Sequence, residues 1–276
     1  MWRSRKLVRN PRFLLSAIYL FVLIVLSIVG TQLFQQDPFR MVGAPMQGPG
    51  EAHLLGTDEL GRDLLSRTLY GARASLAIAV GSVIVASTGG IVAGGWAAYQ
   101  RGVTELVLMQ VVDMMLSLPA LLLGVTTAAF IGRSIYHIIG VLGFVYFPHF
   151  ARIAHSTVLA TRGAGYVEAG RALGVSDARI FLRHILPNIL APLLIQGSLT
   201  LAYAMRLEAT LSFLGLGPPL PLPSWGRMVS LGSKALSSAP HLLIAPVVAL
   251  ALTILAINML GDALRDALDP KLRSVE

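Results

Sequence analysis

The chain has 276 residues, of which 55% are hydrophobic and only 13% charged, and its formal net charge is +8. Soluble domains carry about 25% charged residues, so this balance and a mean hydropathy of +0.70 exclude an ordinary soluble protein and indicate a membrane protein. The positive charge does not indicate nucleic-acid binding, because no basic face with interleaved aromatic residues occurs. The absence of cysteine excludes disulfides and thiolate metal sites.

Long apolar runs predict an all-α membrane protein, because backbone polar groups in lipid must be satisfied within helices or closed barrels. Six transmembrane helices are expected, at about residues 13–34, 75–99, 106–131, 135–155, 189–214 and 242–260. The first run is too long for the apolar core of a signal peptide and no clear cleavage site follows it. We therefore interpret it as an uncleaved transmembrane helix.

The distribution of basic residues predicts that both termini are cytoplasmic. With the N-terminus inside, fourteen of the 22 Lys and Arg residues fall in inner segments and seven in outer segments, and Arg206 lies within a span. Short cytoplasmic loops carry the excess of Lys and Arg in membrane proteins. The polar segment 157–187, between the fourth and fifth spans, is therefore expected in the cytoplasm.

Two further patterns concern packing outside and within the spans. Leu60, Leu64, Leu65 and Leu69 repeat at helical spacing in an outer segment that is too polar to span, which predicts a short interfacial helix or, alternatively, a packed linker. The second span carries small residues at every fourth position, and such a ridge allows another helix to approach closely. These residues are Ser82, Ala86, Gly90, Gly94 and Ala98.

The cytoplasmic stretch "EAGRALGVSDARIFLRHILPN", from Glu168 to Asn188, has the pattern of two short helices with a break. Gly174 lies where a left-handed helix C-cap is expected. Ser176 is a candidate N-cap for the second helix, with Asp177 in its first turn. Pro187 suits the first turn of the fifth span. An apolar stripe is expected along the second helix, formed by Ile180, Phe181, His184 and Ile185.

This stretch resembles the coupling loop of ABC importer permeases, and three other stretches resemble the same family's dipeptide, oligopeptide and nickel branch. In the coupling loop the matching positions are Glu168, Ala169, Gly174, Leu186 and Pro187, while Gly170 and His184 replace the usual alanine and isoleucine. The other stretches are "LGTDELGRDLLSR" at 55–67, "LSFLGLGPPLPLPSWG" at 211–226 and "NMLGDALRDALDPKLR" at 258–273. The likeness is strongest to the second permease of each pair.

The resemblance implies a type I ABC importer permease core with cytoplasmic coupling helices. Residues 1–70 would hold the first span and the external segment, 71–265 the five-helix core with the coupling loop 157–187, and 266–276 a cytoplasmic tail. The implied partners are a second permease subunit, two ATP-binding subunits that carry ATP and magnesium, and an external substrate-binding protein, in a bacterial or archaeal plasma membrane. The stiff loop that contains Pro218, Pro219, Pro221 and Pro223 is a candidate contact for that binding protein.

Three charged residues within the spans are candidates for the passage or its gate. They are Asp113 in the third span and Arg206 and Glu208 in the fifth. A charge at the bilayer centre costs roughly 2.5–3.5 kcal/mol, so such residues face a bundle interior or a water-filled passage. Interhelical ion pairs, or snorkelling of Arg206, are the alternatives. Arg206 and Glu208 are two positions apart and are not expected to pair with each other.

The sequence contains no feature that predicts an enzyme. It has no G-x-x-x-x-G-K-[ST] motif, no convincing nucleophile–base pair and no metal-ligand spacing, so no catalytic, cofactor or metal site is expected. The family resemblance favours di- or oligopeptides as the transported solute, with nickel or another small solute as the alternative. An ion-coupled carrier is the remaining alternative, although the inverted repeats typical of many carriers are not found.

Overall fold

The computed structural model describes residues 10–33, 37–132 and 134–268. The predicted tail at 266–276, the end of the first span at Phe34, and Arg133 therefore lie wholly or partly outside the described residues. Within them the chain is helical and contains no β-strand. The elements are α2 (Pro11–Leu33), α3 (Leu64–Gly90), the π-helical turn η1 (Ile91–Gly95), α4 (Trp96–Gln100), α5 (Val103–Ser117), α6 (Ala120–Ile131), α7 (Ile135–Thr161), α8 (Gly165–Ala172), α9 (Asp177–Ile180), the π-helical turn η2 (Phe181–Ile185), α10 (Leu186–Phe213), α11 (Trp225–Lys234) and α12 (His241–Leu268).

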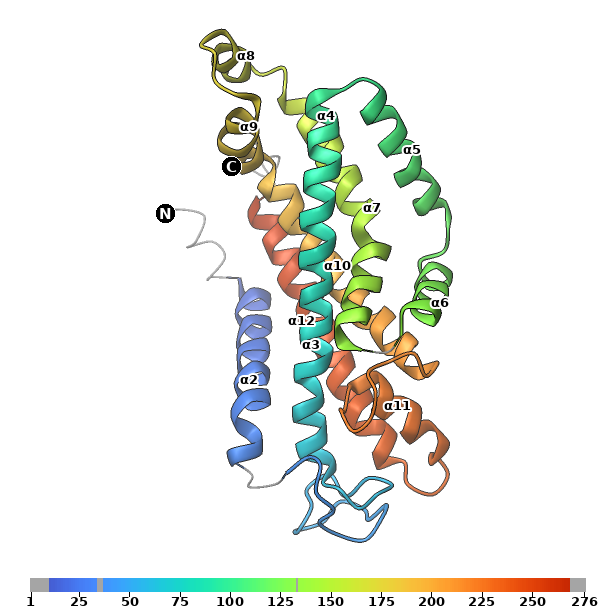
Figure 1. Ribbon diagram of the computed structural model, residues 1–276. Coiled ribbons are helices and arrows are strands. Elements are labelled where there is room, and N and C mark those ends of the chain that lie inside the picture. Colours follow the sequence, from blue (N-terminus) through green and yellow to red (C-terminus); the bar gives the residue numbers. More distant parts are fainter. Residues whose placement is uncertain (1–9, 34–36, 133, 269–276) are drawn as a thin grey trace.

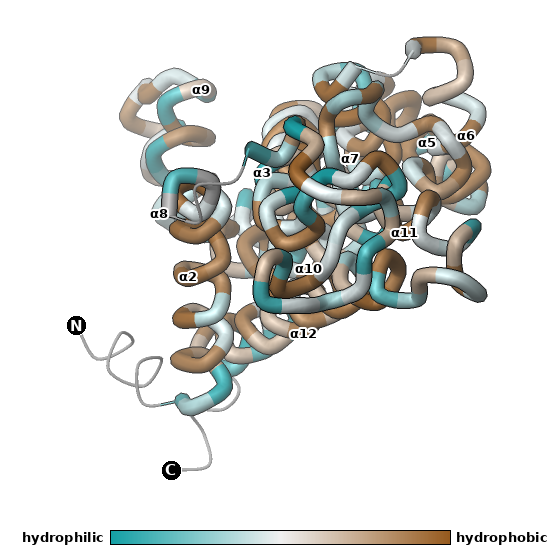
Figure 2. Tube along the Cα trace, turned by 90° about the horizontal axis from the view of Figure 1, so that it is seen from below, coloured by the Kyte–Doolittle hydropathy of each residue, from teal (hydrophilic) through white to brown (hydrophobic). Residues whose placement is uncertain are grey.

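Five long helical runs form a bundle along the long axis of the molecule (Figure 1). They are Pro11–Gly30, Leu64–Gln100, Ile135–Thr161, Asp177–Phe213 and His241–Leu268. At 1.5 Å per residue, a run of about 20 residues crosses the 30 Å hydrocarbon core of a bilayer. Hydrophobic residues cover the outward faces of α2 and α12 (Figure 2). The prediction of an all-α membrane protein is therefore confirmed.

The third predicted span is broken rather than straight. Helices α5 and α6 meet at an angle of 99° across Leu118 and Pro119, so they count as a sixth span only when taken together. A residue that precedes proline avoids the helical region, and Leu118 accordingly has an extended backbone, with ψ of 137°. The expectation of one continuous helix through Pro119 was wrong for this reason.

The predicted interfacial helix at Leu60–Leu69 is not a separate element. Helix α3 begins at Leu64, and the Asp63 carboxylate caps it by accepting a hydrogen bond of 2.8 Å from the Ser66 N–H. The leucines at 64, 65 and 69 therefore belong to the first turns of the second span. Leu64 is only 2% exposed, because α3 packs into the bundle from its first residue.

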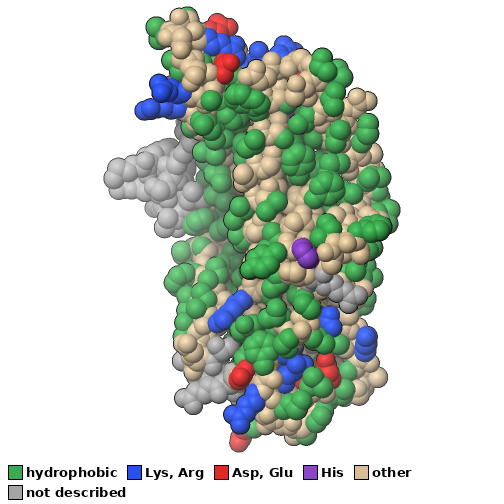
Figure 3. Space-filling view, in the orientation of Figure 1, with side chains coloured by type: hydrophobic (Ala, Val, Ile, Leu, Met, Phe, Trp, Pro, Cys, Tyr) green, Lys and Arg blue, Asp and Glu red, His purple; other side chains and the backbone are tan. Residues whose placement is uncertain are grey.

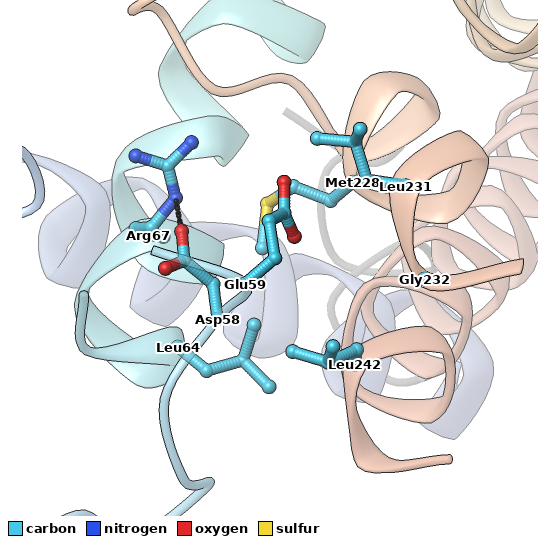
Figure 4. A pocket seen from close by; sticks show the side chains of 8 residues that line it. All are labelled: Asp58, Glu59, Leu64, Arg67, Met228, Leu231, Gly232 and Leu242. Atoms are coloured by element: carbon cyan, nitrogen blue, oxygen red, sulfur yellow. Dashed lines mark ion pairs between the residues drawn. The ribbon is translucent and has the colours of Figure 1, made fainter. Parts of the chain in front are cut away.

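The segment between α2 and α3 is irregular where it is described, and a buried carboxylate, that of Asp58, holds it in place. The Asp58 carboxylate forms ion pairs with two guanidinium groups, at 2.7 Å from Nε of Arg62 and 3.1 Å from Nε of Arg67. Arg67 also donates a hydrogen bond to the Pro38 carbonyl. Figure 4 shows Asp58 and Arg67 facing each other beside Met228 of α11 and Leu242 of α12. The space they enclose measures about 10 Å³, so this corner is a packed joint with room for no more than a water molecule.

The ridge of small residues on the second span packs closely against another helix, as predicted, and that helix is α7 of the same subunit. A Cβ atom added to Gly90 would lie 2.5 Å from Cβ of Phe150, and one added to Gly94 would overlap the backbone of Ala151. Ala86 and Ala98 are fully buried on the same ridge. The backbones of the second and fourth spans are therefore in direct contact, which is the geometry that small residues permit.

Substituting Gly94 with alanine should destabilise the chain, because the added methyl group has no free space. Overpacking of this kind costs about 1–3 kcal/mol. Gly140→Ala on the partner helix α7 is the matched control, since a Cβ there meets nothing within 4 Å. We expect a lower thermal unfolding midpoint for Gly94→Ala and an unchanged or higher one for Gly140→Ala, measured on the detergent-purified chain. Equal midpoints would contradict the close helix contact.

Candidate functional site

Helices α8 and α9 project beyond one end of the bundle, and a glycine sets the angle between them (Figure 1). Gly174 has φ of +71°, the left-handed conformation predicted for it. The N–H of Val175 donates to the carbonyl of Gly170 at 3.1 Å, and the N–H of Gly174 donates to that of Arg171 at 3.0 Å. This pair of bonds is the Schellman motif, which closes a helix end with a left-handed residue.

The start of the second short helix differs in one detail from the prediction. Ser176 occupies the N-cap position with ψ of 143°, but its side chain makes no capping bond. The acidic residue beside it has a different partner, because Asp177 accepts a hydrogen bond of 2.6 Å from the hydroxyl of Tyr99 in α4. Asp177 therefore links α9 to the end of the second span.

The fifth span continues directly from the coupling segment. Residues Asp177–Phe213 form one helical run, and the π turn η2 lies just before Pro187, which is in the first turn of α10 as predicted. A proline inside an α-helix removes one hydrogen bond and its ring clashes with the preceding turn. The wider π turn η2 precedes Pro187 without interrupting the run. A movement of α9 would therefore also move α10.

The predicted coupling residues lie on the surface of this projection. Most are exposed, namely Glu168, Ala169, Gly174, His184 and Pro187, while Gly170 and Leu186 are half-buried. The expectation that His184 joins the apolar stripe was wrong, because its side chain is exposed while Ile180, Phe181 and Ile185 are buried. Gly170 faces Ile180, which brings α8 and α9 together.

Tyr99 is the anchor of the projection, and the sequence analysis missed it. Its side chain is 2% exposed, its hydroxyl accepts from Nε of Arg171 at 3.3 Å, and the Arg171 guanidinium lies 4.8 Å from the ring centre. Phe181 packs edge-on against the same ring. Both short helices are therefore bound to α4 by one side chain. The available signal was the position of Tyr99 between the small-residue ridge and Arg101.

Glu208 lies inside the subunit, in a group of hydroxyls. Its side chain is fully buried and accepts hydrogen bonds from Ser212, at 2.7 Å, and Ser75, at 3.4 Å. The Ser75 hydroxyl in turn accepts from the backbone N–H of Trp225 at 3.2 Å. Glu208 thus joins α10, α3 and α11 and does not reach the surface, so we do not retain it as a passage residue.

Asp113 and its neighbours form a polar face between α5 and α7. Asp113 pairs with Arg152, and both side chains are about half exposed, at 54% and 55%. Glu105 pairs with His155 at 2.7 Å. A hollow of about 550 Å³ lies beside these pairs and is lined by Glu105, Asp113 and His155. The charge on Asp113 is therefore neutralised across two helices, but it stays open to the surface.

Arg206 is exposed on α10 and has an aromatic partner on its own helix. Its guanidinium lies 4.6 Å from the ring centre of Tyr203, a cation–π contact. Thr210, one turn further along, is exposed on the same side. Arg206 and Glu208 thus have separate partners, as predicted, and Arg206 is the one of the two that faces out of the subunit.

Comparison with known proteins identifies the class to which this architecture belongs. Residues 90–274 match the model of the family described as "Binding-protein-dependent transport system inner membrane component". The chain belongs to this family, the permease subunits of ABC importers.

Individual relatives share the full length of the chain. The chain is 40% identical over 271 residues to a protein of Brucella abortus biovar 1 named as a peptide transport system permease, covering 98% of this chain and 91% of the relative. It is 35% identical over 277 residues to the glutathione transport system permease protein GsiD of Pectobacterium atrosepticum, covering 99% and 92%.

A solved structure shares the fold. The MetNI methionine ABC transporter, in an inward-facing conformation, aligns with a TM-score of 0.58 at 20% sequence identity. The alignment covers 75% of this chain and 96% of the MetNI chain. The arrangement of the helices is therefore that of a type I ABC importer permease.

Removing the Tyr99 hydroxyl should loosen α8 and α9 locally. Tyr99→Phe leaves Asp177 and Arg171 without their shared partner, and a hydrogen bond to a charged group contributes about 1.5–3 kcal/mol. We expect backbone amides of residues 165–180 to exchange hydrogen at least about tenfold faster, since each 1.4 kcal/mol is a factor of ten. Tyr166→Phe, which removes one exposed contact to Asn188, is the control. Equal exchange in the two variants would rule out Tyr99 as the anchor.

Proposed function

We propose that this chain is the membrane-spanning permease subunit of an ATP-driven, binding-protein-dependent importer of peptides. It forms half of the passage with a second permease subunit, two ATPase subunits drive it from the cytoplasm, and an external binding protein delivers the substrate. The chain itself hydrolyses no ATP. Relatives named for peptide and glutathione transport, similar over 98% and 99% of the chain, support peptides rather than nickel as the solute.

The end of the bundle that carries α8 and α9 is assigned to the cytoplasm. Arg171, Arg179 and Arg183 all belong to this end, as the positive-inside rule requires. The N-terminal end of α2 and the C-terminal end of α12 are directed toward the same end of the bundle (Figure 1). In the space-filling view, hydrophobic side chains cover the middle of the molecule, and Lys and Arg gather toward its two ends (Figure 3). Both termini are then cytoplasmic.

The observation that carries the proposal is the anchored projection of α8 and α9. Its outer surface presents Glu168 and Ala169 to a partner, while its inner surface is bound to α4 through Tyr99. One continuous helical run leads from Asp177 to Phe213. A push on the projection is therefore transmitted as a rigid-body movement of the fifth span, the kind of domain motion that switches transporters.

The exposed charges on α5, α7 and α10 indicate where the passage runs. Arg206, Arg152 and Asp113 lie within helices that cross the membrane, yet their side chains are exposed. Lipid is an unfavourable neighbour for such groups, and ionisable residues in spans face a water-filled cavity or a partner. We assign this surface to the passage that the two permease subunits enclose, with Arg206 offering hydrogen bonds to a peptide carboxylate or carbonyl.

The coupling role of the projection is tested by Glu168→Lys and Gly174→Val. The first reverses a surface charge, and the second places a β-branched residue at φ of +71°, at a cost on the order of 1–2 kcal/mol. Both variants should insert in the membrane but lose ATPase co-purification, substrate-stimulated ATP hydrolysis and uptake together. Gly163→Val, in open surroundings in the same segment, is the control and should keep all three. Normal coupling in both variants would contradict the proposal.

The passage role of Arg206 is tested by Arg206→Gln and Arg206→Lys. Loss of a charge-assisted hydrogen bond costs about 1.5–3 kcal/mol, so uptake by the glutamine variant should fall at least about tenfold at low peptide concentration. The lysine variant keeps the positive charge and should retain more uptake. Size-exclusion chromatography of the assembled importer should show intact complexes in both cases. Loss of assembly alone would indicate that Arg206 is structural.

A further inference from the structure

A pocket with two unpaired basic side chains lies at the end of α10 that is remote from the coupling helices. It has a volume of about 320 Å³, at the small end of the range of roughly 300–1,000 Å³ for ligand sites. The last turn of α10 and the turn after it form one wall, and α11 forms the other, with Arg227 and Lys234 among its lining residues. In the proposed orientation the pocket opens outside the cell.

Neither basic side chain has a partner of opposite charge in the described part of the chain. Arg227 and Lys234 form no ion pair there, and the buried Nε of Arg227 has no hydrogen-bond acceptor. Other arginines of the outer end, such as Arg62 and Arg67, are paired with Asp58. The pocket therefore places two cationic side chains together without a counter-charge in the described part of the chain.

Capping of α10 does not account for these two cations. The last four carbonyls of that helix are already occupied: those of Thr210, Leu211 and Ser212 accept from backbone N–H groups of the following turn, and that of Phe213 accepts from the Ser230 hydroxyl at 3.1 Å. The Ser233 hydroxyl donates to the Ser230 carbonyl. The donors left for a ligand are thus the guanidinium and the ammonium group, and together they suit an anion.

The pocket lies on the same face of α10 as Arg206. Phe213, which lines the pocket, is seven residues from Arg206, which corresponds to about two helical turns and roughly 10 Å along the axis. Thr210 lies between them, and all three side chains are exposed. If Arg206 faces the passage, the pocket lies at the outer mouth of that passage. Arg206 then lies further into the membrane on the same face of α10.

We propose that this pocket is a carboxylate-binding subsite at the outer mouth of the passage. It takes the terminal carboxylate of a peptide, or the same group on an acidic side chain of the binding protein, between Arg227 and Lys234. The proposal rests on the proposed function, because it needs the face of Arg206 to line the passage. A carboxylate accepts two parallel hydrogen bonds from a guanidinium, and the Arg227 side chain lines the pocket beside Lys234.

The first test measures peptide binding to the assembled importer in phosphatidylcholine nanodiscs without the binding protein. The probes are L-alanyl-L-alanine and its C-terminal amide, followed by saturation-transfer NMR. We expect Arg227→Gln and Lys234→Gln to weaken binding of the free acid about tenfold, as loss of one charge-assisted contact does, and the amide to bind the unmodified importer equally weakly. Arg40→Gln, an exposed external arginine outside the pocket, is the control. Lys234 is exposed, so its variant remains informative if Arg227→Gln fails to assemble.

The second test measures docking of the peptide-free binding protein to the same nanodiscs. A tenfold loss of docking in both pocket variants, with unchanged dipeptide binding, would support the pocket and assign its carboxylate to the binding protein. Both tests are repeated in nanodiscs that contain phosphatidylglycerol, whose phosphate is the competing anion. The proposal is overturned if both variants behave as Arg40→Gln in the two tests, or if they differ from it only in binding of phosphatidylglycerol, since the occupant would then be a lipid phosphate. An importer that binds the dipeptide in this pocket but does not take it up would contradict the proposed function and leave the subsite standing.

Discussion

In a membrane a polar side chain is stable in a hydrogen-bonded interior or in contact with water, and this constraint separates Glu208 from three other charged residues of the described spans. Glu208 is enclosed by the serine hydroxyls of α3 and α10, and Trp225 of α11 donates to one of them. Arg206, Asp113 and Arg152 are open to the surface. Because unpaired charges in hydrocarbon are unfavourable by several kcal/mol, this division separates a residue that holds the subunit together from those that we assign to the passage.

The same constraint gives the subunit a rigid inner frame. Glycine and alanine on the second span let its backbone touch that of α7, and Tyr99 lies in the last turn of that span. Tyr99 binds α8 through Arg171 and α9 through Asp177. The projection formed by α8 and α9 is therefore connected to two packed spans through Tyr99, and it continues directly into the fifth span. Closely packed protein interiors have low compressibility and transmit strain. A displacement of α8 and α9 would therefore move the packed helices together.

The sequence predicted the features that depend on local chemistry. Apolar length located the spans, and the left-handed Gly174 and the small-residue ridge followed from steric rules that act on one or two turns. The features it missed depend on tertiary neighbours. The 99° break at Leu118 and Pro119 lies inside the span expected at 106–131, because apolar length alone does not distinguish a straight helix from a broken one. The contact of Tyr99 with Asp177 joins residues 78 positions apart, which no local pattern reveals.

The candidate site was predictable in part for the same reason. Family motifs located the coupling loop, but whether an intramembrane charge is enclosed or exposed depends on how the helices rotate against each other. Glu208 and Arg206 are only two residues apart, and packing places them in opposite surroundings. The leucines at 64, 65 and 69 fit an interfacial helix and a buried first turn equally well by spacing. The Asp63 cap, with its bond to Ser66, shows that they begin the second span.

The central claim is that α8 and α9 receive the ATPase subunits in the cytoplasm, and the absence of cysteine makes it directly testable. A single cysteine at Ala169, labelled with a photoreactive maleimide in membranes that contain the assembled importer, reports both the side of the membrane and the neighbouring protein. The account predicts labelling only from the cytoplasmic side and crosslinking to the ATPase subunit, and neither for a cysteine at the exposed external residue Leu220. Labelling of position 169 from outside, or a light-dependent product without the ATPase subunit, would contradict it.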